Sequence, residues 1–130
     1  MILTGRTIFT GQVSGIALVS QMGISFYGGV DPETGIITEA GHDLYGQSLA
    51  GRVLVFPTGK GSTVGSYILY QLKHNGTAPT AIINANCETI TAVGCIISEI
   101  PCIDQVDLSQ LQTGMQLLVD ADLGQVEIRK

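Results

Sequence analysis

The glycine-rich turn Gly59-Lys60-Gly61-Ser62-Thr63 holds the residues of this chain that are best suited to chemistry. It follows an apolar run at 52–56, and it precedes a pattern typical of a helix. Glycine adopts backbone conformations closed to other residues, and the first amides of a helix lack intrahelical partners. Such a turn can bind an anion or stabilise a serine alkoxide, which makes Ser62 the first candidate for catalysis.

The turn departs from the common nucleotide-binding and hydrolase motifs. A Walker A loop needs a glycine, four residues and then Gly-Lys-Ser/Thr, whereas Lys60 is followed by Gly61 and the upstream glycine is missing. The Gly-x-Ser-x-Gly motif of serine hydrolases is also absent around Ser62. A plain helix cap by Ser62 or Thr63 is the simplest alternative. On the residues alone, anion binding, catalysis and capping all stay open.

Two histidines and a second glycine pair are further candidates. His42 lies in a glycine-bounded loop and can face the turn. His74 falls at the end of the predicted helix, where a cation is favoured and a structural role is expected. The loop that contains Gly28 and Gly29 can present backbone amides to a ligand, or it can be a tight turn and nothing more.

The cysteines Cys87, Cys95 and Cys102 have Cys-x7-Cys-x6-Cys spacing, which fits no common zinc or iron–sulfur pattern. We therefore expect no metal on this chain, and we interpret the thiols as small buried apolar groups. An odd number of cysteines without paired spacing also argues against a disulfide framework and favours a reducing cytosol.

The composition restricts the partners and the compartment. Charged residues make up only 13% of the chain, against a typical ~25%, so either a partner covers part of the surface or the chain is a compact β-rich domain. A net charge of -5 and the lack of a basic cluster make nucleic acid an unexpected partner. No apolar run reaches the ~18–20 residues of a membrane span and no signal peptide opens the chain, so we expect a cytoplasmic protein.

The predicted elements form a single α/β domain over residues 1–130 that is rich in strands and has few helices. Strands are expected at 2–10, 13–20, 36–38, 52–56, 80–85, 96–98, 101–103, 115–120 and 125–129. Helices are expected at 63–74, with Asn75-Gly76 as its C-cap, and at 89–95, with one helical turn at 108–111. The order strand, helix, strand over 52–85 predicts parallel pairing, and 115–129 predicts a hairpin.

The residues around the turn resemble the aconitase X swivel domain family. The resemblance is carried by the stretches 28–37, 41–42, 51–63, 76–79 and 100–101, and it covers nearly the whole chain. It implies a swivelling β/β/α domain of the aconitase superfamily. The chain length fits a free-standing small subunit rather than a fused domain.

The same resemblance implies that this chain is one subunit of a hydro-lyase and carries half of its active site. The partner would be a large catalytic subunit, in a heterodimer or larger assembly, that carries a four-iron four-sulfur cluster acting as a Lewis acid on the leaving hydroxyl. The reaction would be dehydration of (R)-5-phosphomevalonate to trans-anhydromevalonate 5-phosphate in the archaeal mevalonate pathway of isoprenoid synthesis. Ser62 falls at the family's catalytic serine, the proton acceptor. The predicted contacts of the phosphorylated substrate are Gly59, Lys60, Gly61, Thr63, Gly28, Gly29 and His42.

Two alternatives stay open beside this one. Some members of the family dehydrate cis-3-hydroxy-L-proline, which carries no phosphate. A non-catalytic anion-binding swivel module, comparable to the phosphohistidine carrier domains, is a hypothesis of a different class. Such a carrier needs a histidine at the exposed turn, where Ser62 and Lys60 stand instead.

Overall fold

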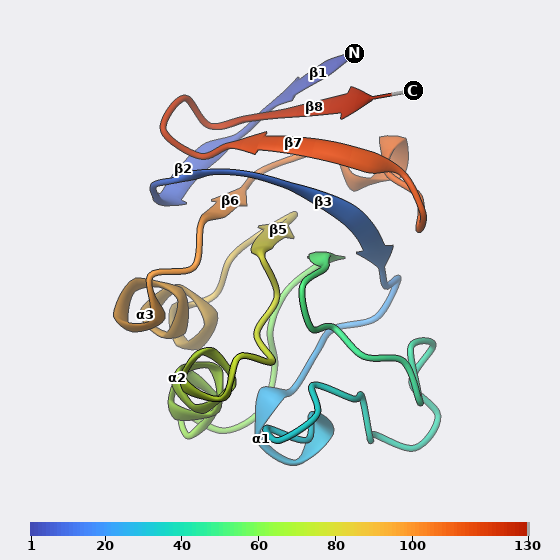
Figure 1. Cartoon of the computed structure of the whole chain (residues 1–130), viewed down its shortest axis with the longest axis vertical. Helices are drawn as coiled ribbons and strands as arrows, with labels where there is room; N and C mark the ends of the chain where they lie inside the picture. The colour runs from blue at the N-terminus through green and yellow to red at the C-terminus, as the bar shows by residue number, and fades with distance from the viewer. Residues whose placement is uncertain (130) are drawn as a thin grey trace.

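A computed structural model describes residues 1–129, which form eight strands and three α-helices. The strands pair in one mixed sheet in the order β1-β8-β7-β3-β4-β5-β6-β2 (Figure 1). Their bounds are β1 Ile2–Thr4, β2 Arg6–Phe9, β3 Gln12–Val19, β4 Val53–Phe56, β5 Ala81–Asn84, β6 Cys102–Asp104, β7 Gln116–Asp120 and β8 Gln125–Arg129. The helices are α1 Phe26–Gly29, α2 Gly65–Asn75 and α3 Thr89–Ser98, with a 3-10 turn, η1, at Leu108–Gln110.

The sheet is bent into two layers, and the helices cover only one of them. Strands β1, β8 and β7 lie on one side of β3–β6, and α1, α2 and α3 lie on the other side (Figure 1). Alternate residues of β4 explain this packing, because Val53 and Val55 join the core between the strand layers while Leu54 and Phe56 join the core that faces the helices. A strand buried on both faces reads as a continuous apolar run. The predicted β/β/α arrangement is confirmed.

Four strands run parallel and set the position of the candidate site. The predicted parallel pairing of β4 with β5 is confirmed, and β3 and β6 extend the parallel set on either side. The carboxyl ends of these strands therefore point to one edge of the sheet, where open α/β sheets bind their ligands. The segments at 20–25, 57–64 and 85–88 leave β3, β4 and β5 at that edge.

The first predicted strand, 2–10, is wrong as a single element, because it breaks at Gly5 into β1 and β2. Strand β1 pairs with β8 and β2 pairs with β6, so β1 and β2 stand at opposite ends of the strand order. Because these two strands are joined at Gly5, the sheet curves until its two ends meet there. The Gly5 amide donates to the Gly124 carbonyl at 2.8 Å, and an added Cβ at Gly5 would lie 2.7 Å from Val106 Cγ2. Strand periodicity carries no sign of this close approach.

Other boundaries also differ from the prediction. Helix α3 continues to Ser98, so the predicted strand at 96–98 is wrong. The β-branched Ile96 and Ile97 lie in the last turns of a helix that packs on α2. Helix α2 begins at Gly65, later than predicted, and its C-cap at Gly76 is confirmed with φ 75°. The predicted strand at 36–38 contributes only isolated bridges. The hairpin of β7 and β8 and the helical turn near 108–111 are confirmed.

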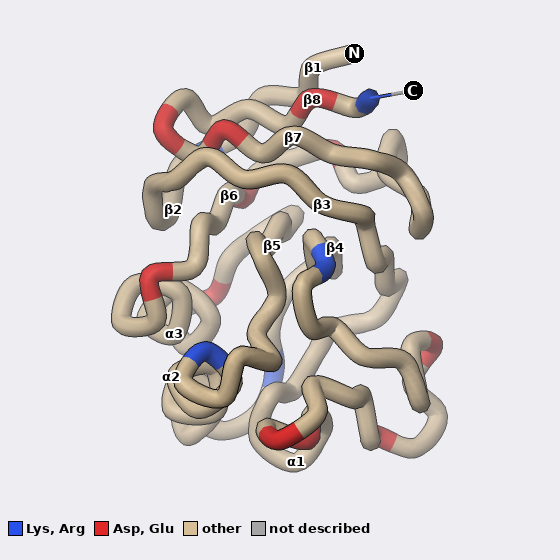
Figure 2. The backbone as a smooth tube through the Cα atoms, in the orientation of Figure 1, with Lys and Arg blue, Asp and Glu red and all other residues tan. Residues whose placement is uncertain are grey.

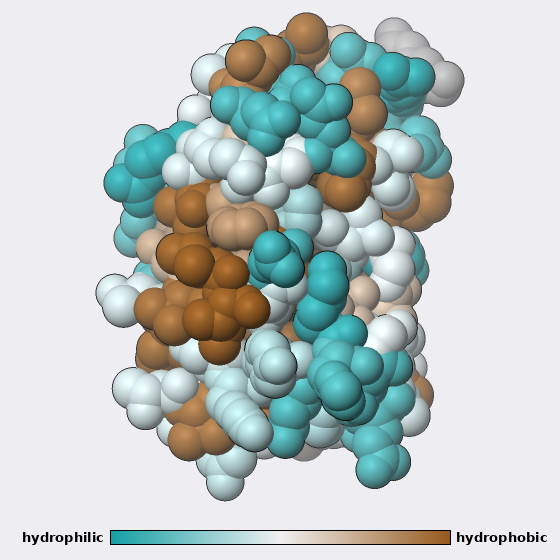
Figure 3. All heavy atoms as spheres, turned by 60° about the vertical axis from the view of Figure 1, so that its left-hand side comes forward, coloured by the Kyte–Doolittle hydropathy of each residue, from teal (hydrophilic) through white to brown (hydrophobic). Residues whose placement is uncertain are grey.

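Charged residues are sparse and scattered along the backbone (Figure 2). On α3 an apolar patch, formed by Val93, Ile96 and Ile97, is exposed (Figure 3). Within residues 1–129, no helix combines the length and the apolar character needed to cross a membrane.

Candidate active site

Residues 57–64, here called the serine loop, leave β4 at the carboxyl edge of the sheet and lead to α2. The segment 20–25, which leaves β3, lies along this loop, and Ile24 pairs with Gly59 in an isolated parallel bridge. The Lys60 amide donates to the Ile24 carbonyl at 3.0 Å, and the Ile24 amide donates to the Thr58 carbonyl at 3.3 Å. The serine loop is thus held on one side by a neighbouring segment of backbone.

Gly59 holds the loop on its other side, against the start of α3. Gly59 is buried, and an added Cβ would overlap Thr91 Oγ1 and Glu88 Oε1. The Glu88 carboxylate is the N-cap of α3 and accepts hydrogen bonds from the amides of Ile90 at 2.7 Å and Thr91 at 2.6 Å. The φ of Gly59 lies outside the left-handed region, so this position needs glycine for close approach rather than for an unusual conformation.

Gly61 needs glycine for two reasons. Its φ is +95°, in the left-handed region that other residues rarely adopt. An added Cβ would also overlap the Ser25 hydroxyl and lie 3.2 Å from Ser25 Cβ. The two glycines around Lys60 therefore fix the serine loop between α3 and the 20–25 segment.

Ser62 is exposed, and its hydroxyl oxygen accepts a hydrogen bond from the Val64 amide at 3.1 Å. The Ser62 carbonyl accepts from the Gly65 amide at 2.9 Å. The N-cap residue of α2 is Val64, so the predicted cap by Ser62 or Thr63 is wrong; Ser62 forms a local hydroxyl turn just ahead of the helix. Its oxygen lies on the Val64 amide near the positive end of α2, an environment that favours negative charge.

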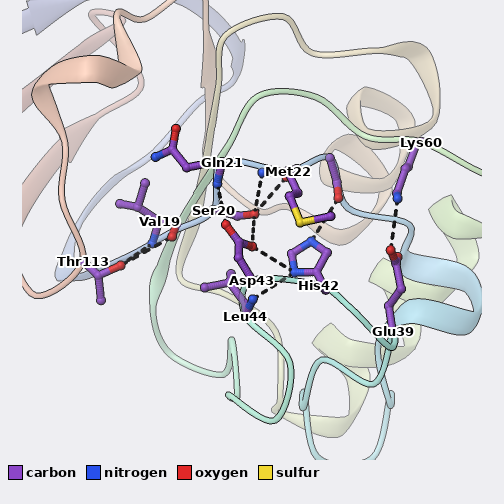
Figure 4. Close-up of polar contacts among 11 residues, drawn as sticks. Val19, Ser20, Gln21, Met22, Glu39, His42, Asp43, Leu44, Lys60 and Thr113 are labelled. Atoms are coloured by element: carbon purple, nitrogen blue, oxygen red, sulfur yellow. Dashed lines mark hydrogen bonds and ion pairs between the residues drawn. The ribbon is translucent and has the colours of Figure 1, made fainter.

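Lys60 forms an ion pair with Glu39, with 3.1 Å between Nζ and Oε2, and both side chains are partly exposed (Figure 4). Glu39 also lies against Gly29, where an added Cβ would be 3.3 Å from Oε1. Beside it, Gly28 is exposed with φ +83°, and within the described residues no atom lies within 4 Å of its Cβ position. The structure thus brings the Gly28-Gly29 turn and the serine loop together through Glu39.

His42 is buried, with 5% of its surface exposed. Its Nε2 is 3.0 Å from the Gly23 carbonyl oxygen, and its Nδ1 accepts from the Leu44 amide at 3.1 Å (Figure 4). Asp43 Oδ1 is also 3.1 Å from Nδ1, but that nitrogen already accepts from Leu44, so we assign the ring proton to Nε2. Both ring nitrogens are used within the chain, and direct contact of His42 with substrate stays a prediction.

Three acidic residues of this region escaped the sequence analysis. Glu88 had only a weak local signal, because acidic residues are favoured near a helix start but glutamate is not among the residues typical of an N-cap. Glu39 and Asp43 had none, because their partners Lys60 and Ser20 are separated from them by 21 and 23 positions.

The cysteines belong to three neighbouring parts of the fold: Cys87 follows β5, Cys95 lies in α3 and Cys102 begins β6. Cys95 and Cys102 are buried, and the sulfurs of Cys87 and Cys102 are 4.0 Å apart. The hydrogen bond with Cys102 and then burial raise the pKa of Cys87. The hydrogen bond with Cys87 works to lower the pKa of Cys102, but the hydrogen bond with Cys95 and burial outweigh it and raise that pKa. Clusters are commonly bound by several cysteines that lie together, but within residues 1–129 no three histidine, cysteine, aspartate or glutamate side chains are grouped so that they could bind a metal ion. The arrangement of these cysteines therefore does not fit an iron–sulfur cluster.

Comparison with known proteins gives the family. Residues 2–128 match the model of the aconitase X swivel domain. The chain is 59% identical over 128 residues to the phosphomevalonate dehydratase small subunit of Thermococcus kodakarensis, covering 98% of this chain and 96% of that protein. It is 53% identical to the protein of the same name from Methanosarcina acetivorans, covering 98% and 91%. The crystal structure of Thermococcus kodakaraensis aconitase X in its holo-form contains a chain that superposes with a TM-score of 0.99 at 58% identity, covering 100% of this chain and 99% of that one. On this evidence the chain belongs to the aconitase X swivel domain family.

Proposed function

We propose that this chain is the free-standing small subunit of a phosphomevalonate dehydratase, a hydro-lyase, and that Ser62 is its general base. The observation that carries the proposal is the position of Ser62: exposed, ahead of α2, with its oxygen on the Val64 amide. High identity to small subunits of that name, over 98% of the chain, supports the substrate class.

The proposed reaction is an elimination. Ser62, as alkoxide, removes a proton from the carbon next to the substrate carboxylate. The electron pair of that C–H bond forms the new double bond, and the hydroxyl on the neighbouring carbon leaves. The proton on Ser62 Oγ and the departing hydroxide together account for one water.

A serine hydroxyl is a weak base unless its alkoxide is stabilised. The Val64 amide can donate to the alkoxide, and the positive end of α2 adds to this stabilisation. Because Gly59 and Gly61 fix the loop before substrate arrives, these groups need little reorganisation during the reaction.

Lys60 is proposed to meet an anionic group of the substrate in competition with Glu39. Their ion pair is partly exposed, so water screens it and a doubly charged phosphate can displace the carboxylate. The exposed backbone at Gly28, Gly61 and Thr63 offers further room for the substrate on the same face.

The partner in this proposal is a large catalytic subunit, in a heterodimer or larger assembly. Ser62 and Lys60 are open to solvent in this chain, which is the state expected of half a site. Since the cysteines here do not fit a cluster, a four-iron four-sulfur cluster would be held by the large subunit. The exposed apolar patch on α3 (Val93, Ile96 and Ile97) is the kind of surface that a partner subunit covers.

Reconstitution with the large subunit tests the proposal. The pair should dehydrate (R)-5-phosphomevalonate and leave cis-3-hydroxy-L-proline unchanged, and the small subunit alone should be inactive. Ser62→Ala should lower kcat by at least about a thousandfold while the subunits still associate, because it removes the base. The matched control is Ser14→Ala at an exposed position of β3, which should keep full activity. Near-normal turnover by Ser62→Ala would remove Ser62 from its role.

A phosphohistidine carrier would be revealed by transfer of phosphate from phosphoenolpyruvate or ATP to a histidine. His42 is buried, and His74 lies in the last turn of α2, at the opposite end from Ser62. Neither position suits a carrier at the exposed turn, so we expect no labelling.

A further inference from the structure

Side chains of the segment 39–44 form hydrogen bonds with the segment 20–25 (Figure 4). Asp43 accepts from the Ser20 hydroxyl at 2.6 Å and from the Gln21 amide at 2.8 Å. His42 Nε2–H donates to the Gly23 carbonyl at 3.0 Å. Ser20 and His42 are buried, so their hydrogen bonds are partly shielded from water, whereas the contact of Asp43 with the Gln21 amide is exposed.

The contact at Gly23 reaches the serine loop in one further step. The next residue, Ile24, exchanges backbone hydrogen bonds with Thr58 and Lys60 on that loop. Gly23 itself packs against the loop, since an added Cβ would lie 3.1 Å from the Thr58 carbonyl oxygen and 3.5 Å from Lys60 Cδ. The position of the Gly23 carbonyl therefore bears directly on the backbone at Lys60.

We propose that His42 is a positioning residue for the serine loop, acting through the Gly23 carbonyl rather than by touching substrate. Its activity readout rests on the dehydratase function proposed above, whereas its structural readout does not. The imidazole with its proton on Nε2 has one donor and one acceptor, and it uses the donor on Gly23 and the acceptor on Leu44. Removal of the donor leaves a carbonyl without its partner beside the loop, which loosens the 20–25 segment.

Two substitutions separate these two hydrogen bonds. In His42→Gln, the side-chain NH₂ reaches about as far as Nε2 and can still donate to Gly23. In His42→Asn, the side-chain oxygen lies about where Nδ1 lies and can still accept from the Leu44 amide, two residues on, as in an Asx turn. Each variant therefore keeps one of the two hydrogen bonds of His42 and loses the other.

Amide hydrogen exchange on the isolated chain gives the structural readout. His42→Asn should raise the exchange rate of the Lys60 amide about tenfold, while His42→Gln should leave it within about twofold of the parent chain. The Leu44 amide should show the opposite pattern. An unchanged rate at Ile83, in the core strand β5, shows that each variant is folded. If Lys60 exchanges at the parent rate in His42→Asn, the proposal is wrong.

The reconstituted enzyme gives the second readout. We expect His42→Asn to lower kcat about tenfold or more with KM nearly unchanged, and His42→Gln to restore kcat. A histidine that binds substrate directly would instead raise KM in both variants without altering exchange at Lys60, and that result would overturn the proposal. If the reconstituted pair does not dehydrate phosphomevalonate at all, the proposed function fails, while the exchange rates still decide the role of His42.

Discussion

Substituting Gly59 with alanine tests whether contact with α3 fixes the serine loop. The new methyl group would overlap Thr91 Oγ1 and Glu88 Oε1, and it would lie 3.1 Å from Glu88 Cδ. To make room, the Glu88 carboxylate must leave the two amides that it caps, which costs about 1 kcal/mol. Overpacking of the remaining atoms adds about 1–3 kcal/mol. The free energy of unfolding should therefore fall by about 2–4 kcal/mol.

Thermal unfolding of the isolated chain measures this loss. Unfolding entropy scales with length, so for 130 residues the expected loss lowers Tm by about 7–15 °C. Gly46→Ala is the control: φ is +84° there and the space around the Cβ position is open, so only backbone strain of about 1–2 kcal/mol is expected. In the reconstituted enzyme, Gly59→Ala should also lower kcat about a hundredfold, because a shift of about 1 Å in the loop misplaces Ser62.

A double-mutant cycle with Glu88→Ser isolates the cause. Serine keeps a cap on α3 but removes the carboxylate that blocks the new methyl group. Gly59→Ala should therefore cost at least about 1 kcal/mol less in the Glu88→Ser background. Additive effects in the cycle, or an unchanged Tm for Gly59→Ala, would refute the explanation given for this glycine.

Four further predictions concern the ion pair, the Cys87 thiol and the patch on α3. Glu39→Gln frees Lys60 from an exposed partner, so KM for the phosphorylated substrate should fall about two- to fivefold; a rise would mean that the carboxylate itself serves the substrate. The raised pKa of Cys87 keeps its thiol protonated in the folded chain, so iodoacetamide at pH 8 should alkylate it at least about tenfold more slowly than a free thiol. Unfolded thiols ionise near pH 8.5, whereas the folded chain keeps Cys87 protonated. The contribution of Cys87 to the free energy of unfolding should therefore be full below that pH and decline above it. Urea titrations of the parent chain and of Cys87→Ala at several pH values measure this contribution. Ile97→Lys should weaken association with the large subunit at least about tenfold without lowering Tm, and unchanged association in a pull-down or by calorimetry would place the interface elsewhere.

The parts of the fold that were predictable are those set by neighbouring residues. The order strand, glycine turn, helix, strand over 52–85 was readable because β4 is uniformly apolar, α2 is amphipathic and Gly76 caps it. The closure of the sheet was not, because it depends on Gly5 approaching segments about a hundred positions away in the chain. The strand predicted at 96–98 failed because β-branched residues also occur in helices that pack on a neighbour, as α3 packs on α2.

The candidate site was likewise predictable only where neighbouring residues define it. The serine loop was identified from its own residues, and the structure brings Gly28 and Gly29 beside it. The contacts that hold the loop in place could not be predicted, because Glu39 pairs with Lys60 across a long stretch of chain. Asp43 and His42 act on the neighbouring 20–25 segment from a similar distance in sequence. His42 was chosen as a loop histidine that faces the site, yet tertiary packing buries its ring.

Two glycines around a lysine suggest a phosphate-binding turn, but the geometry of Gly59 and Gly61 gives another reason why glycine is needed there. Gly59 allows contact with the cap of α3, and Gly61 allows a left-handed turn against Ser25. Both bring the loop close to other parts of the protein, and neither is required by a bound anion. A loop packed on both sides cannot relax when charge appears on Ser62, so its amide stays directed at the oxygen. A base as weak as serine depends on such pre-organisation, which links the glycine spacing to catalysis through rigidity rather than through phosphate binding.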